Sequence, residues 1–499
     1  MRIAIGPIHC DGGHRKEVFV NPYPPRTPQE VQEFISQYGV FKEDTDDFNF
    51  FPQEEIKRRQ GELLKRQVQW AYEGSPYYRE IFDQRRLSPA DLKSTDDLVK
   101  LPVTAKKTYM GRPEDFRLKF TTPSPYDQFY DVTYTTGTTM GKPTPFYNTS
   151  YDHFLLTRAL MRYMKIACVT PDDIIVNTFP LGVVPHIGYV RMNQIAFSIG
   201  ARLVVGNTGS PFPEASVHRT MQELIEMIER FKVTAVGGIG SFCRRLIVEA
   251  ERKGKDFSSV RNVLAMGEGV PRGMREDMRE RLQKMGARNV FISNPFGFTE
   301  AQASFAECAE FSGCHNYDPS LYFMEVVNPE TGERLADGET GHLAITHLNR
   351  RGTVLVRYLI GDISAITNET CPYCGRCGQR LIIKAGSTYG TRTKELVKLK
   401  GTLINPETMK SEISNVLGVA EYQIIFTKED LQDPYSLDKL LIKVAVSDRS
   451  PEEVAREIRE RILITAEMTP KVEFAKPEEI YDPAKSLKAT RVIDLRPGE

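Results

Sequence analysis

The most regular pattern of hydrophobic and polar positions lies between residues 170 and 293. Short runs of β-branched residues alternate there with stretches whose apolar side chains recur at helical spacing. The expected strands are DIIVNTF, ARLVVG, VTAVGG, NVLAMG and NVFIS. One helix between them has an apolar face made of Met221, Leu224, Ile225, Ile228 and Phe231. This alternation predicts a parallel sheet covered by helices on both faces, with ligands beyond the carboxyl ends of its strands.

The pattern differs on either side of this region. The start of the chain includes the proline-rich stretch NPYPPRTPQE and predicts an N-terminal extension. Residues 319–385 contain strands without long helices between them, and the chain after residue 390 has the pattern of a compact α+β unit. We therefore expect an α/β protein with three parts. These are an N-terminal extension (1–54), a large domain with a mostly parallel, helix-covered sheet and a β-rich subdomain (55–390), and a small α+β C-terminal domain (391–499).

Composition limits the classes of partner. The chain has 499 residues, with 66 Lys plus Arg and 66 Asp plus Glu, so no overall positive charge favours nucleic acid or an anionic membrane. No apolar stretch reaches the roughly 20 residues that a membrane span needs, and a signal peptide is not expected. Eight cysteines are too few for a disulfide scaffold, which favours a cytoplasmic location. Small molecules are the expected partners.

Two motifs have the residue types that bind phosphate and metal ions. In YTTGTTMGKPTPFY (134–147), glycines let the backbone approach a phosphate, and threonine hydroxyls can donate to its oxygens. It is not a Walker loop, because Pro143 follows Lys142. In NPFGFTE (294–300), Phe296 could stack on a flat ring and Glu300 could hold a metal ion bound to phosphate. A polar β-turn and a solvated glutamate are the ordinary alternatives.

Three further motifs follow toward the C-terminus. In VRYLIGDIS, Asp362 can accept two hydrogen bonds from a ribose diol, and a simple turn aspartate is the alternative. TRTKELVKLKGTLINP contains Arg392 and Lys394 at the junction to the last domain. KSLKATRVIDLR contains Lys488 in a polar loop, where a solvated surface lysine is the default interpretation.

Together and in this order, the five motifs resemble the signature set of the adenylate-forming superfamily, and more narrowly the phenylacetate–CoA ligase family. MGEGVPRGMRE and VVNPETGERLADGETGHL agree with this resemblance, which covers about residues 55–499. It implies an ATP-dependent, AMP-forming ligase that joins a carboxylic acid to coenzyme A with Mg²⁺. It also implies a mobile C-terminal lid, and family habit suggests a homodimer. The alternatives are an adenylyltransferase resembling the synthetase that places AMP on a deazaflavin coenzyme, and a non-catalytic nucleotide-binding protein.

The resemblance also implies roles for individual residues. Lys488 bridges the acyl carboxylate and the α-phosphate, and Thr299 and Glu300 meet phosphate and magnesium. Lys394 occupies the hinge position. The residues implied in nucleotide binding are Thr135, Thr136, Gly137, Thr138, Thr139, Gly141, Lys142, Gly267, Glu268, Gly269, Asn294, Phe296, Gly297, Asp362 and Arg392.

Two segments depart from the family pattern. Met140 makes the phosphate loop one residue longer. Residues 177–190 do not look like the glycine-rich segment of phenylacetate-activating relatives, so an aryl, small aliphatic or hydroxy acid stays open. Because this segment follows an expected parallel strand, we still expect it to line the acyl pocket. The pocket residues are Phe179, Leu181, Val183, Val184, His186 and Ile187, of which His186 either contacts a polar substituent or is a solvated loop histidine.

A second group of residues suits a structural metal. Cys308 and His315 form one pair, and Cys371 and Cys374 form another about 55 residues later, with Cys377 close by. A Cys/His pair and a Cys/Cys pair suit a closed tetrahedral Zn²⁺ site. A redox CxxC motif and free buried thiols are the alternatives, and Cys377 could replace one of the two nearby cysteines. Some relatives in the family show this set with structural zinc.

Overall fold

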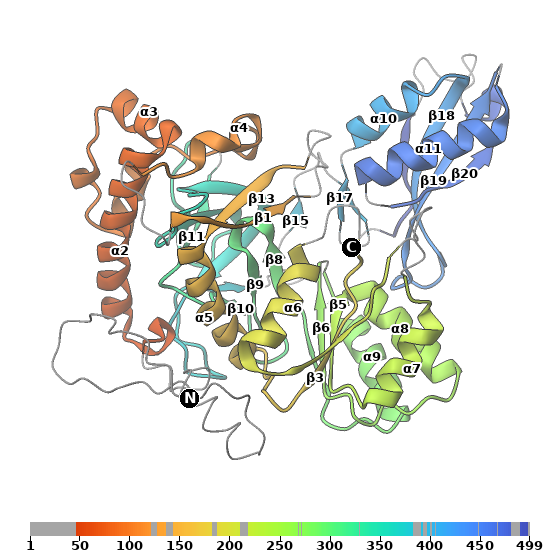
Figure 1. Cartoon of the computed structure of the whole chain (residues 1–499), viewed down its shortest axis with the longest axis horizontal. Helices are drawn as coiled ribbons and strands as arrows, with labels where there is room; N and C mark the ends of the chain where they lie inside the picture. Colours follow the sequence, from red (N-terminus) through yellow and green to blue (C-terminus); the bar gives the residue numbers. More distant parts are fainter. Residues whose placement is uncertain are drawn as a thin grey trace, which may run out of the picture. The chain divides into compact units, whose positions relative to one another are not determined.

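A computed structural model gives the fold of the chain (Figure 1). It describes residues 46–497 apart from 121–126, 136–142, 182–186, 210–217, 268, 271, 329, 383–390, 393–396, 400, 401, 405, 448, 467 and 481–489. Residues from Asp47 onward form one unit by their internal contacts. The division of the chain after residues 54 and 390 stays a prediction.

The expected parallel sheet is present, with the strand order β4-β3-β5-β6-β7. Its strands are β3 (Ile174–Asn177), β4 (Arg202–Val205), β5 (Ala235–Ile239), β6 (Asn262–Met266) and β7 (Phe291–Ser293). Every neighbouring pair is parallel. The strands β5 and β6 are buried along their whole length, as strands with helices on both faces must be.

Helices cover both faces of this sheet (Figure 1). One face packs on α7 (Met221–Phe231), α8 (Gly240–Arg252) and α9 (Arg272–Lys284) through a core that includes Val176, Val236 and Val263. The opposite face presents the alternate residues Ile175, Ala235 and Leu264 to a second core, which includes α5 (Ser150–Ile166) and α6 (Ile187–Ile199). The strand alternation therefore separates the two cores. The α/β prediction is confirmed.

The β-rich subdomain is an antiparallel sheet with the order β10-β14-β13-β12-β11, and β15 also pairs with β13. Its strands are β10 (Cys314–His315), β11 (Tyr322–Val327), β12 (Gly341–His347), β13 (Tyr358–Thr367), β14 (Arg380–Ile382) and β15 (Thr391–Arg392). Two hairpins stand apart from it. They are β1 (Phe129–Tyr134) with β2 (Pro145–Thr149), and β8 (Phe296–Phe298) with β9 (Ala303–Phe305).

The last part of the chain has its own hydrophobic core, which includes Leu399, Ile424, Ile442 and Ile458. A sheet with the order β20-β19-β18-β21 and two longer helices build it. The elements are β16 (Val397–Leu399), β17 (Thr402–Ile404), α10 (Pro406–Ser414), β18 (Val419–Lys428), β19 (Asp438–Val446), α11 (Pro451–Ala466), β20 (Lys471–Phe474), α12 (Pro477–Ile480) and β21 (Val492–Asp494). The mixture of strands and helices agrees with the expected α+β unit.

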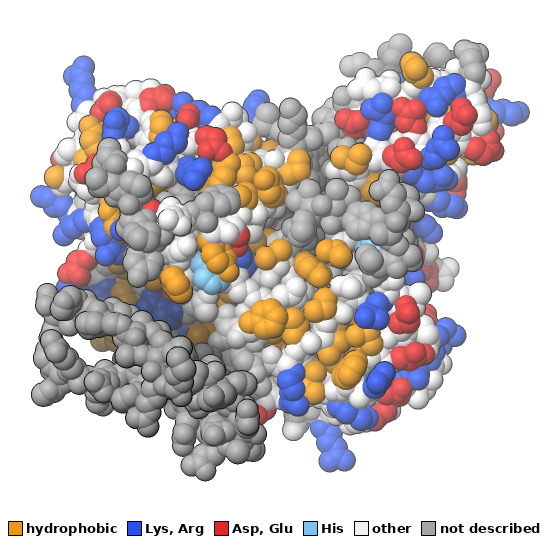
Figure 2. Space-filling view, in the orientation of Figure 1, with side chains coloured by type: hydrophobic (Ala, Val, Ile, Leu, Met, Phe, Trp, Pro, Cys, Tyr) orange, Lys and Arg blue, Asp and Glu red, His pale blue; other side chains and the backbone are white. Residues whose placement is uncertain are grey.

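Helices begin the described chain. They are η1 (Phe48–Phe50), α2 (Gln53–Gly74), α3 (Pro76–Arg85), η2 (Pro89–Asp91), η3 (Thr95–Lys100), α4 (Lys106–Gly111) and η4 (Pro113–Phe116). Within the described part of the chain, no helix combines the length and the apolar character that crossing a membrane requires. On the face shown in Figure 2, Lys and Arg side chains are interspersed with Asp and Glu, in keeping with the zero net charge.

Candidate functional site

The Thr299–Glu300 pair forms a turn between the two strands of the β8–β9 hairpin. A short 3-10 helix, η6 (Thr299–Ala301), connects the strands, and Glu300 is buried within it. One oxygen of the Glu300 carboxylate accepts a hydrogen bond from the Tyr358 hydroxyl at 3.1 Å and lies 3.3 Å from the Lys106 ammonium nitrogen. Tyr358 and Lys106 thus hold the Glu300 carboxylate from two other segments of the chain.

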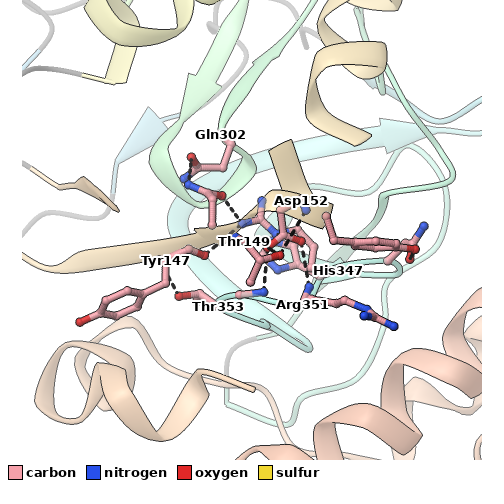
Figure 3. Close-up of polar contacts among 12 residues, drawn as sticks. Tyr147, Thr149, Asp152, Gln302, His347, Arg351 and Thr353 are labelled. Atoms are coloured by element: carbon pink, nitrogen blue, oxygen red, sulfur yellow. Dashed lines mark hydrogen bonds and ion pairs between the residues drawn. The ribbon is translucent and has the colours of Figure 1, made fainter. Parts of the chain in front are cut away.

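His347, which is labelled in Figure 3, holds the backbone of the same turn. Its Nδ1 accepts a hydrogen bond from the Leu355 amide at 3.2 Å, so the proton is on Nε2, which donates to the Glu300 carbonyl at 3.0 Å. Burial, with the Arg350 charge nearby, holds the pKa of His347 well below its usual range. The imidazole is therefore neutral and keeps a single tautomer.

The base of the predicted phosphate loop is closed by a mutual pair of hydrogen bonds. The Thr135 amide donates to the Thr144 carbonyl at 3.0 Å, and the Thr144 amide donates to the Thr135 hydroxyl at 3.1 Å. These residues lie between strands β1 and β2, so the hairpin sets where the loop begins and ends. Thr136, Gly137, Thr138, Thr139, Gly141 and Lys142 lie outside the described residues.

The predicted adenine-side residues follow strands β6 and β7. Gly267, at the end of β6, has a φ of 84°, a conformation that favours glycine. Asn294, directly after β7, donates from Nδ2 to the Ala265 carbonyl at 2.7 Å and accepts at Oδ1 from the Val270 amide at 3.1 Å. Its side chain thus joins the carboxyl ends of two neighbouring strands. Glu268 lies outside the described residues, and Gly269 lies between it and Val270.

The β8–β9 hairpin sets the position of Phe296. A Cβ atom at Gly297 would come within 2.3 Å of the Ser304 hydroxyl, so the close approach of the two strands requires glycine there. The rings of Phe296 and Phe298 are tilted, with centroids 5.7 Å apart. Phe296 is only half-buried and keeps an aromatic surface for a ring to stack on.

The predicted ribose-binding pair lies on neighbouring strands. Asp362 of β13 and Arg392 of β15 are register partners in the antiparallel ladder. Asp362 is 3% exposed. The pairing brings together two residues that are distant in sequence. Lys394 and Lys488 lie outside the described residues.

The expected acyl-pocket segment begins where strand β3 ends. Phe179 is buried, and its ring packs on Gly188, where a Cβ atom would lie 2.7 Å from the nearest ring carbon. Leu181 precedes residues 182–186, and Ile187 begins helix α6. The segment thus leaves the carboxyl edge of the sheet, as does Asn294–Phe298. Val183, Val184 and His186 lie outside the described residues.

The structure brings Cys308, His315, Cys371 and Cys374 together. One ligand atom of each lies within 4.8 Å of all the others. The Cys308 sulfur is 3.7 Å from that of Cys371 and 3.3 Å from Nε2 of His315, and the Cys374 sulfur is 3.6 Å from the same nitrogen. Tetrahedral zinc with Zn–S bonds of about 2.3 Å would set two sulfurs about 3.8 Å apart. The donor set and its spacing therefore fit Zn²⁺.

Within this cluster the Cys374 thiolate is favoured at the expense of Cys308, whose pKa is raised by its contact with Cys374 and by burial. Contact with Cys308 and then with His315 holds the pKa of Cys374 far below its usual value. Burial opposes the charged form of His315, but the neighbouring cysteines prevail and raise its pKa. Cys377 is not in this group, because its sulfur instead lies 3.4 Å from the Thr370 hydroxyl.

Four residues that hold the Thr299–Glu300 turn were not predicted from the sequence. Lys106, His347 and Tyr358 reach the turn from three other segments, and Gln302 directly follows it. Lys106 lies in the stretch KLPVTAKKTY (100–109), outside the five motifs. The motif around Thr299 and Glu300 gave no signal for their distant partners.

Comparisons with known proteins agree on the family. A family model described as AMP-binding enzyme matches residues 73–349, more than half of the chain, and one described as AMP-binding enzyme C-terminal domain matches residues 401–496. The phenylacetate-coenzyme A ligase of Thermus thermophilus is 27% identical over 82% of this chain and 85% of its own length. The Escherichia coli protein of the same name is 26% identical over 89% of this chain and 95% of its own length.

A solved structure of 2-hydroxyisobutyryl-CoA ligase, in complex with 2-HIB-AMP and CoA in the thioesterification state, has the same fold. Its TM-score is 0.73 at 22% identity, over 89% of this chain and 91% of that chain. The same ligase in its postadenylation state has a TM-score of 0.59. The likeness extends over both the large and the small parts of the fold.

Proposed function

Because the chain belongs to the family of AMP-binding enzymes, we propose that it is an AMP-forming acid–CoA ligase, which converts a carboxylic acid, ATP and CoA to acyl-CoA, AMP and diphosphate. The observation that carries the proposal is the Thr299–Glu300 turn, whose buried carboxylate faces Lys106 and Tyr358. The relatives named phenylacetate-coenzyme A ligase match this chain over most of their own length.

The first half-reaction joins two anions, the acid and the α-phosphate of ATP. Residues that counter the developing charge must therefore lie around the phosphate. We assign the binding of the triphosphate to the loop between β1 and β2, the α-phosphate contact to Thr299, and the bridge between carboxylate and phosphate to Lys488. Asp362 and Arg392 hold the ribose, and Phe296 stacks on the adenine.

Mg²⁺ fits the residues that are present. Glu300 offers a carboxylate, the donor type that this ion prefers, and its charge is countered in the protein by Lys106. When bound with ATP, the ion supplies charge neutralisation at the phosphates. Glu300 is the residue that would hold it.

The cluster of Cys308, His315, Cys371 and Cys374 holds Zn²⁺ in a structural role in this proposal. Four protein ligands fill a tetrahedral site and leave no position for a substrate. The cluster joins the segment from β9 to β10, which carries Cys308 and His315, to the turn that ends at Cys374, and so ties two parts of the β-rich subdomain together.

The class of carboxylic acid that the enzyme activates can be identified by an activity screen. Relatives and structural neighbours bear the names of phenylacetate and 2-hydroxyisobutyryl ligases, and the lining that we propose, Phe179 to Ile187, suits an apolar tail. Diphosphate release with aryl, aliphatic and hydroxy acids is the test. We expect one class to give strong acid-dependent release, and release with none of them would contradict the proposal.

We also propose that the enzyme is cytoplasmic and works as a homodimer. Its partners are small molecules, without nucleic acid or a membrane. Light scattering during size-exclusion chromatography tests the dimer, because a mass near 56.7 kDa would identify a monomer.

A further inference from the structure

Gln302 directly follows the Thr299–Glu300 turn, and both its burial and its backbone conformation are unusual for a glutamine. It is completely buried, and its backbone has a φ of 61° and a ψ of 3°. This left-handed conformation is unfavourable for a residue with a Cβ atom, and glycine would adopt it without strain. The contacts of the side chain must therefore offset the strain of the backbone.

The side-chain amide of Gln302 connects four segments of the chain. Its Nε2 donates to the Thr299 carbonyl at 2.6 Å and to the Thr133 hydroxyl at 2.9 Å. Its Oε1 accepts from Asn148 Nδ2 at 3.0 Å and from the Arg191 guanidinium at 2.5 Å. In Figure 3, Gln302 belongs to the set of polar contacts that also contains Tyr147, Asp152 and His347.

The orientation of this amide is fixed by its neighbours. Arg191 can only donate, so Oε1 must face it. Asn148 is fixed in turn, because its Oδ1 accepts from Arg350 while its Nδ2 donates to Asp131. The Gln302 Nε2 is therefore the atom that faces the Thr299 carbonyl, and a glutamate at this position could not make that bond.

The partners of Gln302 lie beside the predicted phosphate loop. Thr133 is on β1, two residues before the loop base at Thr135, and Asn148 is on β2, after the loop. Arg191 is on α6, is 4% exposed and forms an ion pair with Asp131 of β1 at 2.8 Å. One side chain thus links the hairpin that flanks the loop to the turn that bears Glu300.

We propose that Gln302 is a positioning residue for the adenylation half-reaction, which fixes the Thr299–Glu300 turn relative to the β1–β2 hairpin through its bonds to the Thr299 carbonyl, Thr133 and Asn148. The inference rests on the proposed roles of Thr299 and Glu300. Fixing these groups matters because the reacting atoms must be held in one geometry, and a misplacement of about 1 Å can cost about 100-fold in rate. The thioester-forming half-reaction, which starts from the finished adenylate, does not need this alignment.

The test compares two variants of Gln302. Gln302→Glu keeps an acceptor for Arg191 and Asn148 but cannot donate to the Thr299 carbonyl, and Gln302→Met keeps the bulk without any hydrogen bond. We expect both to lower acid-dependent ATP–diphosphate exchange by about 10- to 100-fold, through kcat more than through KM for ATP. Thioester formation from supplied acyl-adenylate and CoA should change by less than about threefold. Phenylacetate and 2-hydroxyisobutyrate are the acid probes.

A matched control separates positioning from stability. Gln379 is another buried glutamine whose amide makes two bonds to the backbone of Met324, away from the turn. Gln379→Met should lower the melting temperature about as much as Gln302→Met but leave the ratio of the two half-reaction rates unchanged. Equal loss of both half-reactions in the Gln302 variants, or wild-type exchange in both variants, would overturn the inference.

Two further measurements keep the inference distinct from the proposed function. Calorimetry of ATP with and without Mg²⁺ needs no acid, and Gln302→Glu should reduce the gain in affinity that Mg²⁺ gives. Glu300→Gln should abolish that gain. If Glu300→Gln changes neither binding nor exchange, the proposed role of the turn fails. If Glu300→Gln abolishes exchange while both Gln302 variants behave as wild type, only the role of Gln302 fails.

Discussion

The Thr299–Glu300 turn and the cluster of Cys308, His315, Cys371 and Cys374 differ in what satisfies their buried polar groups. At the turn, protein groups do so: Tyr358 and Lys106 contact the carboxylate, and His347 donates to the carbonyl. In the cluster, three sulfurs and one imidazole nitrogen, all of them metal-ligand types, face each other, and three of their separations are 3.3 to 3.7 Å. The proposed zinc ion would lie between these atoms and bind all four of them. The protein therefore organises the turn in advance, whereas the proposed metal organises the cluster.

This difference predicts that changes at the proposed catalytic residues alter rates and leave stability nearly unchanged, whereas changes at the cluster alter stability first. A buried polar group that is satisfied by protein can be exchanged for an isosteric one at little structural cost. A metal ligand cannot be exchanged in this way, because binding of the metal is coupled to folding.

The largest expected effect is on chemistry. Lys488→Ala should lower adenylate formation by about 1,000-fold, because it removes the cation from the developing charge. Transfer from a supplied acyl-adenylate to CoA should stay nearly intact, and so should the melting temperature. ATP–diphosphate exchange and single-turnover thioester formation measure the two half-reactions. Equal loss of both would show that Lys488 does not serve the first step alone.

Removal of the metal should have the next largest effect. We expect about one zinc per chain, and Cys374→Ser should lower the free energy of unfolding by on the order of 3–4 kcal/mol, as loss of a tightly bound ligand does. Cys377→Ser is the matched control, because its sulfur contacts Thr370 outside the cluster. Elemental analysis and denaturant unfolding are the measurements. Purified protein without metal, or equal free energies of unfolding for the two variants, would remove the distinction between the cluster and the turn.

At the turn, Glu300→Gln should lower the rate without a large loss of stability. The amide keeps an acceptor for Tyr358 but loses the charge, so adenylation should fall about 100-fold. The melting temperature should change by only a few degrees. If stability collapses instead, Glu300 belongs with the cluster as a structural group.

The smallest expected effect concerns pH. The folded protein keeps His347 neutral because burial holds its pKa well below that of the unfolded chain. As pH falls below about 6.5, only the unfolded state gains a proton at this residue, so each further unit should cost up to about 1.4 kcal/mol of stability. His347→Gln should show a shallower loss between about pH 6.5 and 5.5 in denaturant unfolding. Parallel slopes for the two proteins would show that His347 is not kept neutral.

The sequence allowed prediction of the features that short-range patterns encode. Alternating strands and helices predicted the parallel sheet, and the spacing of Cys308, His315, Cys371 and Cys374 predicted their cluster. The resemblance placed Asp362 and Arg392 together, and the ladder has them as partners.

The residues that hold the Thr299–Glu300 turn could not be predicted, because they reach it through tertiary contacts. Lys106, His347 and Tyr358 meet at Glu300 from distant parts of the chain, and no local pattern marks that meeting. The left-handed backbone at Gln302 was missed for a related reason. No glycine or turn motif stands there, and only the buried hydrogen bonds of the side chain explain the conformation.

The most direct test of the central claim is the product balance of the complete reaction. Purified protein with ATP, Mg²⁺, CoA and the acid selected by the screen should form acyl-CoA, AMP and diphosphate in equal amounts, and no product should form without the acid. Chromatography with mass detection measures all three. Formation of ADP and phosphate, or transfer of AMP to a deazaflavin coenzyme without any need for CoA, would contradict the assignment as an AMP-forming acid–CoA ligase.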